Sequence, residues 1–163
     1  MRPPRPYGPC PPAPIPCCAG AVQFVQLTAM HPSPIRVCLV EDSSLVRLRL
    51  AGMLRDLWDV EQVFEAGTVA EARELLPGAK PHLVVVDMRL PDGDGLEVVA
   101  AAKRLTPRPA VVVLTNYAYD QLRSTCLEAG ADLFLDKRTE FDRLPAIVAG
   151  LRRNGGSNGG ATP

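Results

Sequence analysis

The sequence predicts an α/β fold, a doubly wound five-stranded parallel sheet with five helices covering its two faces. Five short apolar segments alternate with five segments of helical periodicity, and the connections between them are a few residues long. The segments at 83–86 and 110–114 are unbroken runs of apolar, mostly β-branched residues, which is typical of strands buried on both faces. Because crossovers between parallel strands are right-handed, few topologies remain possible.

Each predicted strand is a short apolar segment bounded by polar or turn-forming residues. The strands are expected at 35–40, 60–66, 82–87, 110–114 and 132–135. After the third of these, Pro91, Gly93 and Gly95 indicate a tight loop before the next helix.

The predicted helices begin at capping residues and end at proline or glycine. Ser43 or Ser44 caps the first helix, in which apolar residues recur at helical spacing as far as Leu57. The second opens at Gly67-Thr68, and Pro77-Gly78 is expected to end it. The remaining helices are expected at about 96–105, 119–129 and 140–152.

The chain of 163 residues is long enough for one domain with a sizeable core. Residues 1–34 are rich in proline and are predicted to be a disordered tail, whereas 35–152 form the folded domain. Residues 153–163 are rich in Gly, Ser and Asn, so a flexible end is expected. With so little chain after the fifth helix, we expect a stand-alone domain without an output module.

Composition argues against several classes of partner. Lys and Arg total 18, as do Asp and Glu, so no basic footprint for nucleic acid or an anionic membrane is expected. No apolar run approaches the roughly 20 residues that span a bilayer. The five cysteines form no C-x-x-C pair, which argues against a zinc site and a disulfide framework. A cytoplasmic protein without nucleic-acid or membrane partners is therefore predicted.

Chemically active side chains follow four of the five strands. The strand ends deliver Glu41, Asp42, Asp87, Thr115 and Lys137. Because the carboxyl ends of parallel strands meet at one edge of a sheet, these side chains are expected to converge. Unpaired carboxylates at such a spacing would repel and raise one another's pKa. A hard divalent cation resolves that conflict, and Mg²⁺ is the cofactor we predict.

These residue types suit phosphoryl transfer. Asp87 can act as a nucleophile towards phosphorus and form an aspartyl phosphate. The metal would be held by Asp42 and Asp87, with Glu41 acting through water, and would neutralise charge on the transferring group. Lys137 and the Thr115 hydroxyl would bind other phosphoryl oxygens.

At these residues the sequence resembles the receiver domain of two-component response regulators, in particular the stand-alone type similar to the chemotaxis regulator. The resemblance spans about 35–152 and rests on several motifs in order. They are Glu41-Asp42 with Arg47 five residues on, the Asp87-x-x-x-Pro91-x-x-x-Gly95 run, Thr115, the run 127–132, and Phe134-x-x-Lys137.

The resemblance implies a flavodoxin-like receiver fold in which Asp87 takes a phosphoryl group from a histidine kinase or a His-phosphotransfer protein. It implies that the backbone carbonyl of Arg89 joins the metal shell. It also implies that Thr115 and Phe134 rearrange together as a switch. That switch would reshape the face of the fourth helix, fifth strand and fifth helix, where an output protein, not identifiable from the sequence, would bind. Such a domain is a signalling module rather than an enzyme.

Three positions depart from the commoner family pattern. Glu41 stands where Asp is usual, and Asn116 is bulkier than the Ala or Gly that often follows the hydroxyl residue. Arg138 follows the lysine where many relatives have proline.

Two alternative functions are compatible with the sequence. One is a small Mg²⁺-dependent phosphotransfer enzyme or hydrolase, in which Asp92-x-Asp94 forms the metal cluster and Glu41 is the base. That alternative leaves Thr115 and Lys137 unexplained. The other is a phosphorelay shuttle that passes the phosphoryl group onward.

Overall fold

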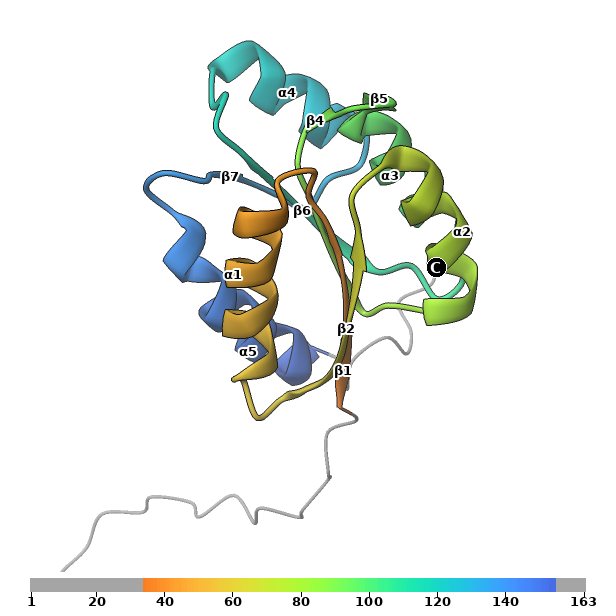
Figure 1. Cartoon of the computed structure of the whole chain (residues 1–163), viewed down its shortest axis with the longest axis vertical. Coiled ribbons are helices and arrows are strands. Elements are labelled where there is room, and N and C mark those ends of the chain that lie inside the picture. Colours follow the sequence, from red (N-terminus) through yellow and green to blue (C-terminus); the bar gives the residue numbers. More distant parts are fainter. Residues whose placement is uncertain (1–33, 155–163) are drawn as a thin grey trace, which may run out of the picture. The chain divides into compact units, whose positions relative to one another are not determined.

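The computed structural model describes residues 34–154, and they form one parallel sheet flanked by helices (Figure 1). The strands of this sheet are β1 Ile35–Val40, β2 Val60–Ala66, β3 Leu83–Val86, β6 Ala110–Thr115 and β7 Leu133–Asp136. Their order is β2-β1-β3-β6-β7, and every neighbouring pair is parallel. The predicted five-stranded doubly wound sheet is confirmed.

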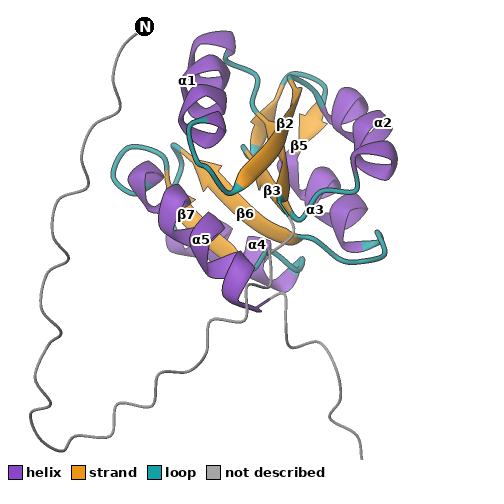
Figure 2. Ribbon diagram, turned by 90° about the horizontal axis from the view of Figure 1, so that it is seen from below, coloured by secondary structure: helices purple, strands orange, loops and turns teal. Residues whose placement is uncertain are grey.

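Five helices cover the two faces of the sheet. They are α1 Ser44–Arg55, α2 Val69–Ala79, α3 Gly95–Lys103, α4 Asp120–Glu128 and α5 Leu144–Asn154. Helices α1 and α5 pack on one face, and α2, α3 and α4 pack on the other (Figures 1 and 2). No helix between residues 34 and 154 has the length and apolar character needed to cross a membrane.

The central strand β3 contributes to both apolar cores because side chains alternate along a strand. Val84 and Val86 lie in the core beneath α2, α3 and α4. Leu83 and Val85 lie in the core beneath α1 and α5. This alternation explains why the segment reads as an uninterrupted apolar run.

Capping side chains set the starts of the first two helices, as the sequence predicts. The Ser43 hydroxyl accepts a hydrogen bond from the backbone N–H of Val46, and the Thr68 hydroxyl accepts one from that of Glu71. These bonds satisfy N–H groups that have no partner within the helix.

The predicted end of α2 is wrong. Pro77 and Gly78 lie inside the helix, which ends at Ala79, and Lys80 follows in a left-handed conformation with φ 43°. Proline has a fixed φ that suits a helix, but Pro77 donates no backbone hydrogen bond, and the helix continues for only two residues beyond it. The left-handed residue then stops the helix, and its N–H still bonds to the carbonyl of Leu76.

The loop after β3 contains structure that the sequence pattern did not predict. Strands β4 Arg89–Leu90 and β5 Gly93–Asp94 pair antiparallel within it. Before α5, a 3₁₀ turn occupies Phe141–Arg143, within the segment predicted as the start of the fifth helix. The predicted tails at 1–34 and 153–163 lie almost wholly outside the described residues.

Candidate functional site

The candidate site lies at the carboxyl edge of the sheet, where backbone hydrogen bonds fix the residues that follow the strands. The N–H of Glu41 bonds to the carbonyl of Ala66, 3.0 Å away, and that of Asp87 to Val40, 2.9 Å away. The N–H of Lys137 continues the ladder to Thr115. The sheet therefore holds four segments, distant in sequence, at one edge.

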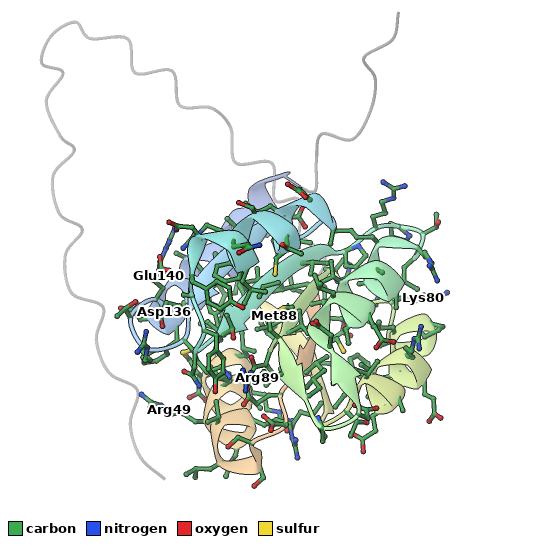
Figure 3. The ribbon with its side chains drawn as sticks, turned by 90° about the horizontal axis from the view of Figure 1, so that it is seen from above. Arg49, Lys80, Met88, Arg89, Asp136 and Glu140 are labelled. Atoms are coloured by element: carbon green, nitrogen blue, oxygen red, sulfur yellow. The ribbon has the colours of Figure 1, made fainter. Side chains whose placement is uncertain are left out.

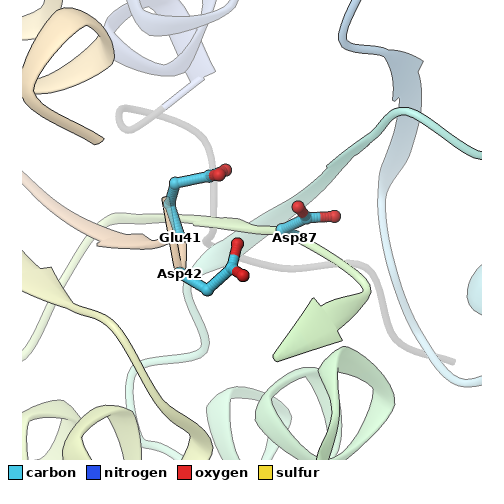
Figure 4. A group of neighbouring side chains, drawn as sticks. All are labelled: Glu41, Asp42 and Asp87. Carbon is cyan, nitrogen blue, oxygen red and sulfur yellow. The ribbon is translucent and has the colours of Figure 1, made fainter. Parts of the chain in front are cut away.

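Three carboxylates gather at this edge. Glu41, Asp42 and Asp87 each offer an oxygen, and these three oxygens lie within 4.8 Å of one another (Figure 4). Glu41 and Asp87 are buried, whereas Asp42 is exposed to solvent. The structure thus brings together all three side chains that the sequence nominated as metal ligands.

Lys137 bridges the two buried carboxylates. Its Nζ atom lies 2.6 Å from Oε2 of Glu41 and 2.6 Å from Oδ2 of Asp87. Burial raises the pKa of Glu41, and the charges of Asp87 and Asp42 add to that effect, while Lys137 opposes it. Burial alone would lower the pKa of Lys137, but the two carboxylates outweigh it and the pKa is raised. The ammonium therefore stays charged.

The backbone around Asp87 constrains its carboxylate further. Oδ1 of Asp87 accepts a hydrogen bond of 2.6 Å from the N–H of Met88. Gly95 packs so closely against the backbone of Asp87 that a Cβ atom at position 95 would collide with the carbonyl oxygen of Asp87. Its N–H bonds to the carbonyl of Met88, so the start of α3 supports the loop that carries Asp87.

Arg47 has a role at the site that helical periodicity did not reveal. The sequence pattern assigns it to the solvent side of the first helix, but its side chain is only 25% exposed. Its Nη1 donates a hydrogen bond of 2.6 Å to the backbone carbonyl of Glu41. In the sequence, the signal for this role is the position of Arg47 five residues after Asp42, in the motif shared with receiver domains. That position does not show the direction in which the side chain points.

Thr115 and Phe134 lie on neighbouring strands on the same face of the sheet. Thr115 is fully buried, and its Oγ1 accepts a hydrogen bond from the N–H of Tyr117 at 3.3 Å. Phe134 is 3% exposed and stands opposite Val113, two residues before Thr115. The two predicted switch residues are thus diagonal neighbours.

Arg89 and Tyr117 join the loop after β3 to the loop after β6. The guanidinium of Arg89 lies over the Tyr117 ring, 4.1 Å from its centroid. Figure 3 shows Arg89 close to Met88, the residue that follows Asp87. Periodicity could not have indicated this contact, because both residues lie in connecting segments. The predicted role of the Arg89 carbonyl as a metal ligand stays a prediction.

Asp92 and Asp94 serve as helix caps. Asp92 accepts hydrogen bonds from the N–H groups of Val69 and Ala70 at the start of α2, at 2.7 and 2.9 Å. These backbone bonds keep the pKa of Asp92 below its usual range. Asp94 caps α3 through the N–H of Leu96. Since both carboxylates are engaged in this way, they are poor candidates for the metal cluster of the hydrolase alternative.

A groove opens beside the acidic cluster, between α1 and the segment that links β7 to α5. It has a volume of about 370 Å³, and Lys137 forms part of its wall. The guanidinium of Arg49 of α1 lies over the Phe141 ring there, 4.7 Å from its centroid. The other lining residues are Val46, Leu50, Asn116 and Arg138. Lys137 is the residue that this groove shares with the site.

Known proteins resemble this chain over most of its described residues. The response regulator receiver domain family matches residues 37–149. The transcriptional regulatory protein PdtaR of Mycobacterium tuberculosis is 39% identical over 123 residues, which cover 74% of this chain and 58% of that protein. The DNA-binding transcriptional activator DevR/DosR of the same species is 36% identical over 114 residues, covering 70% of this chain and 52% of that protein.

Solved structures agree with the sequence relatives. The signal receiver domain of the response regulator NarL from Mycobacterium tuberculosis superimposes with a TM-score of 0.68 at 26% identity. That match covers 75% of this chain and 98% of the solved domain. By contrast, the matched part of this chain spans little more than half the length of the curated relatives.

Proposed function

This chain belongs to the response regulator receiver domain family, and we propose that Asp87 is the residue that accepts the phosphoryl group. The observation that carries the proposal is the bridging of Glu41 and Asp87 by Lys137 at the carboxyl edge of the sheet. A nucleophilic carboxylate, further acidic groups and a charged ammonium are what aspartyl phosphorylation requires.

The transfer forms one bond and breaks one bond at phosphorus. A carboxylate oxygen of Asp87 attacks the phosphorus, and the bond from phosphorus to the donor nitrogen or oxygen breaks, leaving its electron pair on the donor. Lys137 already donates to Asp87 and can move to a phosphoryl oxygen as charge develops there. The Thr115 hydroxyl ends the neighbouring strand and can donate to another phosphoryl oxygen.

The acidic cluster fits a magnesium ion. Its three carboxylates supply hard oxygen ligands. Burial raises the pKa of Glu41, with smaller contributions from the charges of Asp87 and Asp42, and a nearby cation would favour its ionised form. Asp42 and Asp87 would hold the ion, with Glu41 acting through water and the Arg89 carbonyl completing the protein ligands. When bound, Mg²⁺ supplies charge neutralisation of the transferring phosphoryl group.

The phosphodonor we propose is a sensor histidine kinase or a His-phosphotransfer protein. Two observations support a docking position over the groove beside α1. Lys137 lines both the groove and the acidic cluster, so a donor seated there can reach Asp87. On the outer face of α1, Leu45 and Leu48 are largely exposed, which suits contact with an apolar protein surface.

The output we propose is a change in the surface formed by α4, β7 and α5, driven by Thr115 and Phe134. The domain that carries it spans residues 35–152. The comparisons bear on the output partner: the relative DevR/DosR is a DNA-binding transcriptional activator. DNA binding thus occurs among the relatives of this chain. The relatives therefore do not support the prediction that this protein has no nucleic-acid partner.

Intact-mass measurement with a small phosphodonor tests the proposal. Incubation of the protein with acetyl phosphate and Mg²⁺ should add one phosphoryl group, and excess EDTA should prevent it. Asp87→Asn should abolish the addition, because the amide is not a nucleophile. Asp92→Asn is the matched control, since Asp92 lies in the same loop but caps α2, and it should retain phosphorylation. Phosphorylation of Asp87→Asn at the wild-type level would refute the assignment.

A further inference from the structure

Lys137 begins the turn that follows β7, so its backbone lies where the chain leaves the sheet. Its N–H bonds to the carbonyl of Thr115, 2.9 Å away. From this point the side chain reaches Glu41 and Asp87, each 2.6 Å from Nζ. A lysine side chain is a compact charge on a long flexible stem. The place of the ammonium therefore depends on how firmly the backbone of Lys137 is held.

The two residues that flank Lys137 are bonded to each other across it. Oδ1 of Asp136 accepts a hydrogen bond of 2.8 Å from the backbone N–H of Arg138, which fixes the backbone two residues on. The guanidinium of Arg138 reaches the same carboxylate, with Nε 3.3 Å from Oδ1 and Nη2 3.2 Å from Oδ2. These bonds from the side chain and the backbone of Arg138 hold the pKa of Asp136 below its usual range. Lys137 thus lies inside a closed ring of bonds.

A second carboxylate supports the same turn. Oε2 of Glu140 accepts a hydrogen bond of 3.0 Å from the N–H of Asp136, and the N–H of Glu140 donates one of 2.8 Å to the carbonyl of Asp136. The two residues lie side by side in Figure 3. Oε1 of Glu140 also accepts a hydrogen bond from Arg143. Asp136 and Glu140 together therefore fix the backbone on both sides of Lys137.

The bonds between Asp136 and Arg138 act locally rather than on the whole fold. The side chain of Arg138 is 69% exposed, and an exposed ion pair contributes little to the stability of a domain. By contrast, the side chain of Lys137 is only 8% exposed. The main effect of the bonds is therefore on the direction in which the buried lysine leaves the turn.

We propose that Asp136 is a positioning residue for Lys137: by bonding to Arg138 across the lysine, it fixes the backbone from which the ammonium reaches Asp87. The inference rests on the proposed function, because it takes Lys137 as the cation that binds a phosphoryl oxygen during transfer. A hydrogen bond of this kind changes the population of the positioned state by about two- to ten-fold. The rate of transfer follows that population, since a catalytic cation acts only from the correct place.

The test compares full-length wild type with Asp136→Ala, Asp136→Asn and the control Asp142→Ala. Asp142 is an exposed acidic residue in the neighbouring 3₁₀ turn, so its replacement removes the same charge nearby. The first readout is the ¹H–¹⁵N signal of the Lys137 ammonium, assigned from its loss in Lys137→Arg. An ammonium bonded to two buried carboxylates exchanges protons slowly with water and gives such a signal, whereas a displaced one does not. The second readout is the initial rate of phosphoryl addition from acetyl phosphate with Mg²⁺, followed by intact mass.

Asp136→Ala should remove the Lys137 ammonium signal and slow phosphoryl addition by about two- to ten-fold. Asp136→Asn should keep most of both, because its amide oxygen can still accept the bond from the N–H of Arg138. Asp142→Ala should match wild type. Glu140→Ala should act in the same direction as Asp136→Ala, and it replaces that variant if Asp136→Ala does not fold. A merely structural role for Asp136 would lower stability without removing the ammonium signal from the folded protein.

The ways in which the test can fail are distinguishable. If Asp136→Ala retains the ammonium signal seen in Asp142→Ala, the inference about Asp136 is overturned while the proposed function stands. A lost signal with an unchanged rate overturns it too, because the position of Lys137 would then not serve the transfer. If wild type gains no phosphoryl group, the proposed function is overturned, and the inference that rests on it is overturned as well.

Discussion

The Nζ atom of Lys137 lies 2.6 Å from Oδ2 of Asp87, although the two residues are 50 positions apart in the sequence. The side chains of both are almost fully buried. A buried ion pair contributes little net free energy to folding. Removing one partner nevertheless destabilises the fold strongly, because the other charge remains buried and uncompensated. The ammonium is therefore expected to stabilise the folded domain, in addition to the phosphoryl binding proposed for it.

Replacing Lys137 by Gln should destabilise the domain at neutral pH. The variant leaves Glu41 and Asp87 close together without their cation, which should lower the free energy of unfolding by roughly 3–5 kcal/mol. Millimolar Mg²⁺ should restore part of that loss, since a ligand that binds only the folded state stabilises it. Urea titrations with and without Mg²⁺ provide the measurement.

The matched control for Lys137 is Arg55→Gln, which breaks an exposed ion pair with Glu65. That substitution should cost no more than about 1 kcal/mol and should be insensitive to Mg²⁺. Equal stability of Lys137→Gln and wild type would contradict the structural role assigned to the ammonium.

The Thr115→Ala variant should still accept a phosphoryl group on Asp87. The conformational change that phosphorylation causes in the surface of α4, β7 and α5 should be smaller than in wild type. The substitution removes the hydroxyl that is proposed to move towards the phosphate, while Asp87 and the acidic cluster stay intact. On phosphorylation, amide chemical-shift changes across residues 119–149 should be clearly smaller than in wild type. Thr106→Ala alters an exposed threonine in the segment before β6 and serves as the control. Identical shift changes in all three proteins would exclude the hydroxyl–aromatic coupling.

Two Gly→Ala substitutions should have opposite effects on stability. At Gly95 a Cβ atom would collide with the backbone of Asp87 and Met88, so the loop must shift and the free energy of unfolding should fall by roughly 1–3 kcal/mol. At Gly52, inside α1, a Cβ atom meets nothing within 4 Å. Alanine there should therefore raise stability by about 0.4–1 kcal/mol. Urea titrations of both variants measure their free energies of unfolding. Equal stability of Gly95→Ala and Gly52→Ala would contradict the close packing inferred at Gly95.

His82 should make stability depend on pH in the weakly acidic range. Its Nδ1 accepts a hydrogen bond of 3.0 Å from the N–H of Arg36. Burial and the nearby Arg36 charge lower the pKa of His82 below 6.5, with Glu61 opposing them. The unfolded chain then binds more protons than the folded one, so stability should rise with pH from below the folded pKa up to about 6.5 and level off above it.

His82→Asn keeps a hydrogen-bond acceptor near the Arg36 N–H but cannot titrate in this range. Unfolding free energies measured from pH 5 to 8 should therefore show a shallower rise in the variant than in wild type. The same pH dependence in both proteins would mean that His82 keeps its ordinary pKa in the folded state.

The fold and the meeting of the site residues could be predicted because strand direction determines both. β1 and β2 have the predicted bounds: β1 is a mainly apolar run that ends at Glu41-Asp42, and β2 ends before the Gly67-Thr68 helix start. Once the strands are parallel, Glu41, Asp87 and Lys137 must reach the same edge. None of this requires knowledge of side-chain orientation.

The missed features depend on three-dimensional contacts that local patterns do not encode. Pro77 is tolerated in α2 because it lies in the last turn, and a pattern treats any proline as a stop. Arg47 turns towards the backbone of Glu41 rather than towards solvent, a choice of side-chain direction that periodicity cannot make. The guanidinium of Arg123 in α4 lies over the Phe134 ring of β7, a contact between a helix and a strand whose relative position is set only by tertiary packing.

The position of β3 between the two cores has a consequence for how the protein opens. Its backbone N–H groups are flanked by strands on both sides and covered by apolar side chains on both faces, so local fraying cannot expose them. They should exchange with deuterium only through global unfolding, whereas amides of α4, in which only Cys126 is buried, should exchange through smaller openings. Asp87 directly follows this protected strand, so it should keep its position when α4 opens locally.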